Sequence, residues 1–395
     1  MDIKNQLDFT KIPRETKLLL EIIKDENETI LTDTQKALFK NIDWDLFVEL
    51  VLHHRVYPYI LPKIEKLKDR LIPEYVVQKI NQYYRHNVIK MLQLCGEMEQ
   101  VSKLLIENEI HPLFLKGPVL ATDLYGDLSL RTSGDLDVLI PIEELEKAEE
   151  LILNAGYEKN EYIQSVLNDW KWRHHHFTYF HPIKGIKLEI HWRLNPAPSK
   201  EPNFFDLWKR KRIYSTTSYP VYFLGIEDLF LFLVTHGARH GWSRLRWLVD
   251  IHQLVKKDIN WFTLTRHLKK FKCDHIGGQA IILTTQLLET NLTDEMKPLI
   301  CRQRPFQLAQ QAIFYIEKMV HLHTAPLPHD VSTYHSKHLI SLLTFKQRIF
   351  QVLSTLHPYY IDVETLPLPK RLHFLYFILR PFLLIKRRKK KYSLN

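Results

Sequence analysis

The sequence has few cysteines, and none is placed for a structural role. Only three occur among the 395 residues, at Cys95, Cys273 and Cys301. Their wide separation and odd number exclude a disulfide framework and the paired spacing of a zinc site. No apolar run is long enough to cross a bilayer, and the chain starts without a signal-peptide pattern. These absences predict a cytoplasmic protein.

Acidic residues are missing from the last part of the chain. Residues 370–395 contain nine Lys or Arg and no Asp or Glu, whereas the whole chain has a formal net charge of +10. The rest of the chain is therefore almost neutral, which makes no strong case for nucleic-acid binding. The charge instead marks a basic tail that ends in six consecutive basic residues, 386–391.

Glycine is also scarce, with 11 glycines against 20 prolines, so few flexible linkers are expected. The chain is too long for one ordinary core, and apolar residues at helical spacing dominate both ends. We therefore predict an α+β fold, in which a small mixed β-sheet core is flanked by mainly helical N- and C-terminal regions. The expected parts are a helical region at 1–105, an α+β core at 106–223, a helical domain at 224–369 and an apolar-basic tail at 370–395.

Hydrophobic periodicity locates the principal elements. A three-to-four-residue repeat predicts a long helix, and short apolar runs bounded by Gly or Pro predict strands. The predicted helices include 76–105, 118–125, 143–155 and 245–255, the strands are 112–116, 135–140, 177–180 and 186–194, and 325–336 is expected to be a loop.

Two carboxylates one residue apart carry the most chemical information. Asp135 and Asp137 lie on the predicted strand 135–140, where residues two apart point to the same face. Adjacent carboxylates repel each other unless a cation lies between them. Mg²⁺, or Mn²⁺ in its place, binds such oxygen ligands and often a substrate phosphate as well. We therefore predict that this pair binds a divalent metal.

A phosphate-binding corner is expected just before the pair. Lys116 and Gly117 end a short strand and Pro118 suits the first turn of a helix, whose N-terminal amides favour anions. Arg131 and Ser133 lie in the loop before Asp135. We predict that Lys116, Gly117, Arg131 and Ser133 bind a nucleotide.

A third carboxylate is expected from a neighbouring strand. In the run 187–193, alternation puts Glu189, His191 and Arg193 on one face and apolar residues on the other. Glu189 would complete the metal site or accept the proton of an attacking hydroxyl.

Histidines cluster in two places. Adjacent residues of a strand point to opposite faces, so 174–176 is not expected to chelate zinc as a unit. We interpret His176 and His191 as side chains at the edge of the cleft. His236 and His240, four residues apart on a predicted helix, either line a surface between domains or contact the substrate.

Taken together, these motifs resemble a known family. Lys116-Gly117, Leu124-Tyr125, Arg131, Asp135-Leu-Asp137 and 189–192 are similar to the uncharacterised nucleotidyltransferase family of the polymerase-β-like superfamily. Further similarity lies at 42–44, 54–56, 240–242 and 245–250, so that the resemblance covers about residues 40 to 260.

The resemblance implies transfer of a nucleoside monophosphate from an NTP to an acceptor hydroxyl, with pyrophosphate release and with magnesium. It assigns metal binding to Asp135, Asp137 and Glu189. Lys116 and Gly117 occupy the place of the superfamily's glycine-serine pair, and here Pro118 replaces the serine. The acceptor, whether a small molecule or a macromolecule, is not indicated.

Two alternatives remain open from the residues alone. A sugar-nucleotide glycosyltransferase also uses Asp-x-Asp, although no alternating strands and helices precede the motif here. A non-catalytic accessory protein would keep the fold and dock through its tail. The apolar segment from 372 and the basic residues to 391 fit either peripheral contact with an anionic membrane or a final helix packed on the C-terminal domain.

Overall fold

A computed structural model describes residues 6–24, 32–68, 70–160, 164–322, 324 and 326–392. The side chains of Lys386 and of 388–392 are outside this description, so the predicted basic run at 386–391 lies mostly outside the described side chains.

The centre of the described chain is a seven-stranded mixed sheet with the order β3-β4-β5-β2-β1-β7-β6. Strand β2 pairs in parallel with β5 and β1 pairs in parallel with β7, while the other neighbours are antiparallel. The predicted α+β class with a mixed sheet is confirmed. The strands are β1 (Leu113–Phe114), β2 (Asp135–Leu139), β3 (Glu158–Lys159), β4 (His176–His181), β5 (Ile186–His191), β6 (Arg212–Tyr214) and β7 (Val221–Phe223).

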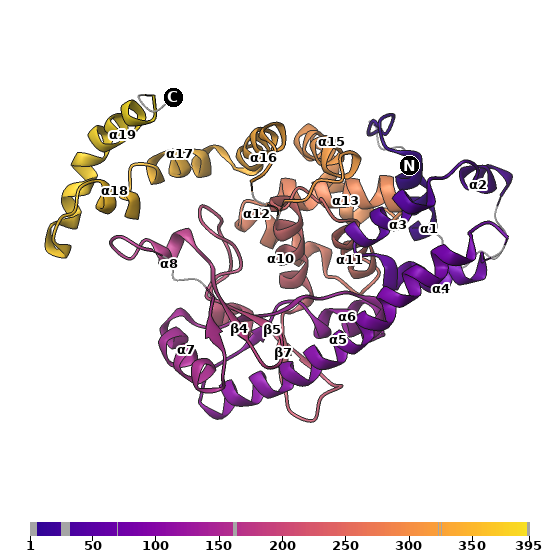
Figure 1. The fold of residues 1–395 in the computed structure, drawn as a ribbon, viewed down its shortest axis with the longest axis horizontal. Coiled ribbons are helices and arrows are strands. Elements are labelled where there is room, and N and C mark those ends of the chain that lie inside the picture. The colour runs from indigo at the N-terminus through magenta and orange to yellow at the C-terminus, as the bar shows by residue number, and fades with distance from the viewer. Residues whose placement is uncertain are drawn as a thin grey trace.

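Helices precede, interrupt and follow the strands (Figure 1). Those before the sheet are α1 (Arg14–Lys24), α2 (Asp33–Leu38), α3 (Trp44–His53), α4 (Tyr57–Lys66) and α5 (Glu74–Glu107). Between strands lie α6 (Pro118–Tyr125), α7 (Leu145–Asn154), α8 (Trp170–Arg173) and α9 (Phe204–Lys209). After the sheet come α10 (Ile226–Arg239), α11 (Leu245–Leu254), α12 (Trp261–Lys270), α13 (Asp274–Leu288), α14 (Lys297–Ile300), α15 (Gln303–Glu317) and α16 (His329–Leu342).

One face of the sheet packs on α5 and α7. Alternate side chains of β2 and β5, including Leu136, Val138 and Leu188, are buried in one cluster with residues of these two helices. The intervening residues of both strands, Asp137 and Glu189 among them, must point to the opposite face. That face is turned toward the helices that follow the sheet (Figure 1).

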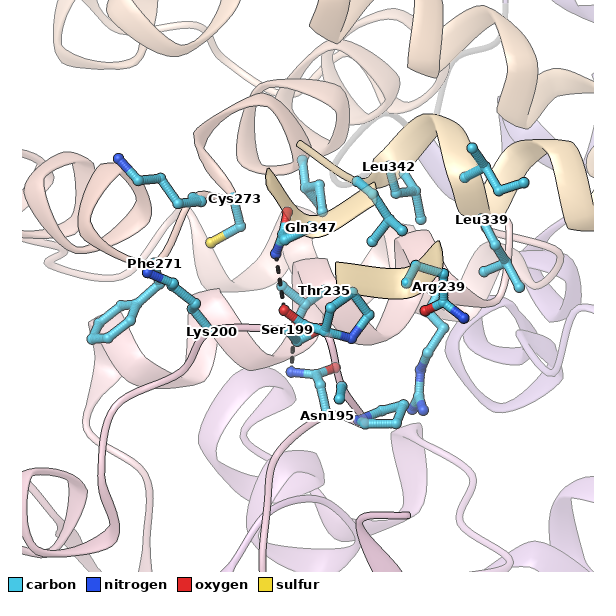
Figure 2. A pocket seen from close by; sticks show the side chains of 18 of the residues that line it. Asn195, Ser199, Lys200, Thr235, Arg239, Phe271, Cys273, Leu339, Leu342 and Gln347 are labelled. Carbon is cyan, nitrogen blue, oxygen red and sulfur yellow. Dashed lines mark hydrogen bonds between the residues drawn. The ribbon is translucent and has the colours of Figure 1, made fainter. Parts of the chain in front are cut away.

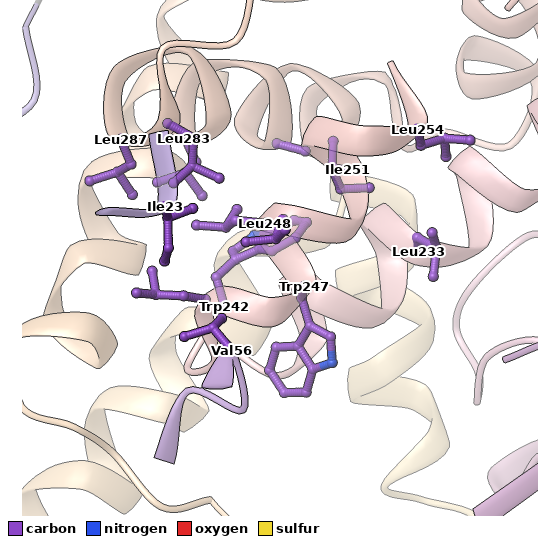
Figure 3. Close-up of a cluster of buried hydrophobic side chains, with 14 of the residues drawn as sticks. Ile23, Val56, Leu233, Trp242, Trp247, Leu248, Ile251, Leu254, Leu283 and Leu287 are labelled. Carbon is purple, nitrogen blue, oxygen red and sulfur yellow. The ribbon is translucent and has the colours of Figure 1, made fainter. Parts of the chain in front are cut away.

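The N- and C-terminal helices share a second core. Ile23 of α1 and Val56 lie in the same buried cluster as residues of α10, α11 and α13 (Figure 3). Trp242 is fully buried there, and a Cβ at Gly237 would lie 2.4 Å from its ring. One core thus joins helices from before the sheet to helices from after it. The domain boundaries predicted at residues 105 and 223 remain predictions.

Most predicted elements lie near the observed ones, but the loop at 325–336 is wrong from residue 329 onward. Helix α16 starts at His329, with Pro328 as its N-cap residue. Proline has no amide hydrogen to donate, and a helix leaves its first amides unpaired, so proline is compatible with a helix start. The prolines therefore mark the beginning of this helix rather than an extended loop.

The chain ends in an arm made of α17 (Phe345–Ser354), α18 (Tyr360–Thr365) and α19 (Tyr376–Tyr392), which extends away from the helical region (Figure 1). Val166, from the segment before α8, is buried in a small cluster with Tyr376 and Leu383 of this arm. Asp362 forms ion pairs with Arg380 and Arg387. None of the helices in the described ranges is both long and apolar enough to cross a bilayer.

Candidate active site

The register between β2 and β5 places the predicted carboxylates side by side. Asp137 is paired with Glu189, and Asp135 with Lys187, across the two parallel strands. These strands are short and rich in Leu, Val and Ile, which suits strands that are buried on one face. The two motifs, separated by about fifty residues of sequence, therefore form one polar row.

Asp137 is the buried centre of this row and has no exposed surface. Its Oδ1 lies 3.1 Å from Lys116 Nζ and 3.2 Å from His191 Nε2. Burial alone would raise the pKa of Asp137, but Lys116 and His191 outweigh this effect and lower the pKa. Its Oδ2 is buried and has no hydrogen-bond partner among the described residues.

Glu189 is held by groups on both sides. Its Oε1 lies 2.5 Å from Lys187 Nζ, and its Oε2 lies 3.5 Å from His191 Nε2 and 3.8 Å from His176 Nε2. Against the effect of burial, these neighbours bring the pKa of Glu189 far below its usual value. A carboxylate with so low a pKa is a weak base and a good metal ligand.

Asp135 lies at the more open end of the row. Its carboxylate is 32% exposed and its Oδ2 is 3.9 Å from Lys187 Nζ. Burial and the nearby charge of Asp137 raise the pKa of Asp135. The opposite shifts of the two aspartates reflect their different distances from cations, and they agree with the predicted repulsion between them.

The donor atoms suit a divalent cation. One oxygen each from Asp137 and Glu189 and a nitrogen of His191 lie within 4.8 Å of one another. The partnerless Oδ2 of Asp137 is a buried acceptor, which a cation would satisfy. Two carboxylates and one imidazole fit Mg²⁺ or Mn²⁺, and the imidazole favours Mn²⁺ more than an all-oxygen set would. Asp135 is not part of this close group.

His175 is a site residue that the sequence reasoning missed. Its Nε2 is 3.2 Å from His176 Nδ1, and these two histidines form a second close group with His191. The expectation that adjacent histidines diverge was wrong here, because β4 begins only at His176 and the alternation of a strand does not apply before it. Burial lowers the pKa of His176 to about 4.

The corner at Gly117 adopts the conformation that only glycine takes readily. Gly117 has a φ of 85° and precedes α6, which starts at Pro118 as predicted. An added Cβ would lie 3.7 Å from the carbonyl oxygen of Asp135, so the corner packs directly on β2. Ser133 Oγ donates to that same oxygen at 3.0 Å. Gly117 and Ser133 are therefore next to the carboxylate row.

Arg131 is buried and paired with a carboxylate of α11, and the nucleotide contact predicted for it remains a prediction. Its guanidinium is 1% exposed and binds Asp250 through two contacts of 2.8 and 2.9 Å. Tyr125 also donates to Asp250, at 2.7 Å. Arg131 thus connects the loop before β2 to α11, and its charge is already balanced by a buried partner.

Other arginines supply the positive charge near the loop before β2. A cavity of about 370 Å³ is lined by Arg55, Lys90 and the backbone around Ser133 and Gly134. Burial and mutual repulsion with Arg55 lower the pKa of Arg244 to about 10. Within the described ranges neither Arg55 nor Arg244 forms an ion pair with a carboxylate. Both arginines lie far from the Asp135–Asp137 motif in sequence, which is why spacing arguments did not identify them.

His236 and His240 lie beside the site but outside both close groups. Their rings are 4.6 Å apart and both contact the ring of Trp247, at 5.6 and 5.4 Å. Burial and the charge of Lys116 bring the pKa of His236 well below its usual value. A substrate contact by these histidines remains a prediction.

Comparisons with known proteins add the family. No curated protein matches the chain. A family model described as uncharacterised nucleotidyltransferase matches residues 40–289, which include the carboxylate row, the Gly117 corner and the helices through α13. The match covers more than half of the chain and extends beyond residue 260, where the resemblance seen in the motifs ended. The chain belongs to this uncharacterised nucleotidyltransferase family.

Proposed function

We propose that the protein is a divalent-metal-dependent nucleotidyltransferase, which transfers a nucleoside monophosphate from an NTP to an acceptor hydroxyl and releases pyrophosphate. The pairing of Asp137 with Glu189, with one buried oxygen of Asp137 left without a partner, is the observation that carries this proposal. Family membership supports the same class of reaction.

Each group near the row has a distinct part in the proposed reaction. Asp137, Glu189 and His191 would hold the cation, with Asp135 beside them, and the bound ion would neutralise charge on the phosphates. Lys116 adds a fixed positive charge beside Asp137. The cavity beside Ser133 and Gly134 fits the triphosphate, because Arg55 and Lys90 line it. Arg244 lines an adjoining pocket together with Arg55 and adds positive charge there.

We expect an NTP with Mg²⁺ or Mn²⁺ to raise the melting temperature of the protein and, with a suitable acceptor, to yield pyrophosphate. All four NTPs should be compared. The variants Arg55→Gln and Arg244→Gln should each weaken NTP binding about tenfold or more, because each removes a charge-assisted contact. Arg85→Gln, an exposed arginine of α5, is the matched control. Release of a nucleoside diphosphate from a sugar nucleotide would instead favour a glycosyltransferase.

We further propose that the C-terminal arm contacts an anionic lipid surface. Exposed apolar side chains follow one another at helical spacing along its last part, at Phe374, Ile378, Phe382 and Ile385. No acidic residue occurs after Glu364, while nine basic residues follow it. Apolar insertion together with attraction to anionic headgroups accounts for both features.

Sedimentation with lipid vesicles tests this contact. Binding should be strong to vesicles that contain phosphatidylserine, weak to pure phosphatidylcholine, and reduced by salt. The double variant Ile378→Glu, Phe382→Glu should lower binding about tenfold or more, since it replaces two exposed apolar side chains by charges. Ile183→Glu, at a side chain that is 92% exposed elsewhere, is the control. Equal binding to both vesicle types would contradict the proposal.

A further inference from the structure

A second cavity lies beyond the carboxyl end of β5. It has a volume of about 410 Å³ and is bounded by the loop 195–200, the end of α10 and residues of α16 and α17. Figure 2 shows Arg239 and Phe271 at opposite ends of the view, with Leu339 and Leu342 across from Thr235. The volume is in the range of sites for small ligands.

The walls of this cavity combine apolar and cationic groups. Leucine, isoleucine, proline and phenylalanine side chains form much of the lining, and the charged lining residues are Lys200, Arg239 and Lys272. No Asp or Glu lines the cavity. A ligand that matches these walls has an apolar body and an anionic group.

Arg239 is the partly buried cation of the cavity. Its Nη1 contacts His175 Nε2 at 3.3 Å, and its Nε is buried with no hydrogen-bond partner among the described residues. It forms no ion pair with a carboxylate in that part of the chain. A guanidinium in this state is costly to bury and is satisfied by a carboxylate or phosphate, which binds it through two parallel hydrogen bonds. Its charge also disfavours a cation at the adjacent histidines.

The position of the cavity relates it to the carboxylate row. Strands β2 and β5 are parallel, so the cavity at Ser133 and Gly134 lies where β2 starts, and the cavity at 195–200 lies past the end of β5. The contact of Arg239 with His175, whose ring is 5.4 Å from that of His191, connects the second cavity to the row. Two ligands could therefore reach the row from its opposite ends.

We infer that this second cavity binds the acceptor, and that the acceptor is an amphipathic molecule whose carboxylate or phosphate group pairs with Arg239. The inference rests on the proposed function for its chemistry. A hydroxyl oxygen of the acceptor would bond to the α-phosphorus of the NTP, the bond from that phosphorus to the bridging oxygen would break, pyrophosphate would leave with the electron pair, and the hydroxyl proton would pass to water.

Calorimetric titration without NTP or metal tests the cavity independently of transfer. The probes are decanoate, decyl phosphate and the uncharged 1-decanol. We expect at least one anionic probe to bind at least tenfold more tightly than decanol, and Arg239→Gln to remove this preference. Comparing the affinities for decanoate and decyl phosphate shows whether the cavity prefers a carboxylate or a phosphate. Arg266→Gln, at an exposed arginine of α12, should leave binding unchanged.

A second variant keeps the test valid if Arg239→Gln does not fold. Ile340→Trp, at a lining residue that is 52% exposed, should fill the cavity and abolish binding of the anionic probes. Equal affinity for decanol and both anions, or binding that neither variant alters, would overturn the inference. Retained probe binding with no transfer from any NTP would instead count against the proposed function alone.

Discussion

Replacing Asp137 with asparagine is expected to lower nucleotide transfer by about a thousandfold, which corresponds to several kcal/mol of lost charge stabilisation. The substitution keeps the shape of the side chain and removes the negative charge from the centre of the row. Asp137 is the fully buried carboxylate that Lys116 and His191 contact, and its second oxygen is without a partner. Pyrophosphate release under saturating NTP measures the effect.

Metal binding supplies the second measurement for this variant. Titration with Mn²⁺ should show tight binding by the wild-type protein and greatly weakened binding by Asp137→Asn, while far-UV circular dichroism remains the same. Glu146→Gln is the matched control, because Glu146 is an exposed carboxylate on α7 in the same part of the fold. If Asp137→Asn transfers nucleotide at the wild-type rate, the metal-dependent mechanism proposed for this row is wrong.

The carboxylates could be predicted because their pattern is local. Two aspartates at i and i+2 on a short apolar strand must share a face, and Glu189 follows the same alternation on its own strand. The sequence predicted that the two strands are neighbours, but not that they are parallel with Asp137 beside Glu189. That register depends on how both strands pack over α5 and α7, which is a property of the folded chain.

The surroundings of the carboxylates were harder to predict because they come from distant segments. Arg55 precedes α4 and Arg244 precedes α11, and only the folding of both helical regions around one core brings them to the loop before β2. The partner of Arg131 was missed for the same reason, since Asp250 is 119 residues away. Short-range spacing identifies candidate ligands, but it does not reveal which charges are already neutralised.

The ion pair between Arg131 and Asp250 should be among the most costly interactions to break in this protein. Both side chains are 1% exposed, and Tyr125 adds a hydrogen bond to the same carboxylate. Removing one partner of such a pair leaves a buried charge without compensation, which costs about 3–5 kcal/mol. We therefore expect Asp250→Asn and Arg131→Met each to lower the free energy of unfolding by about this amount in urea titrations.

A double variant and a less deeply buried ion pair provide the comparison for this loss of stability. Arg131→Met with Asp250→Asn should be less destabilised than the sum of the single variants, because no charge then remains buried alone. Asp123→Asn breaks the bidentate ion pair with Arg212, in which the two side chains are 16% and 29% exposed. This variant should cost less than either buried variant, about 1–2 kcal/mol. Since Arg131 lies four residues before Asp135 and Asp250 lies on α11, the buried pair holds the start of β2 against the helical region. If Asp250→Asn is as stable as the wild type and only nucleotide binding falls, Arg131 acts on the substrate, and the structural role assigned to it here is wrong.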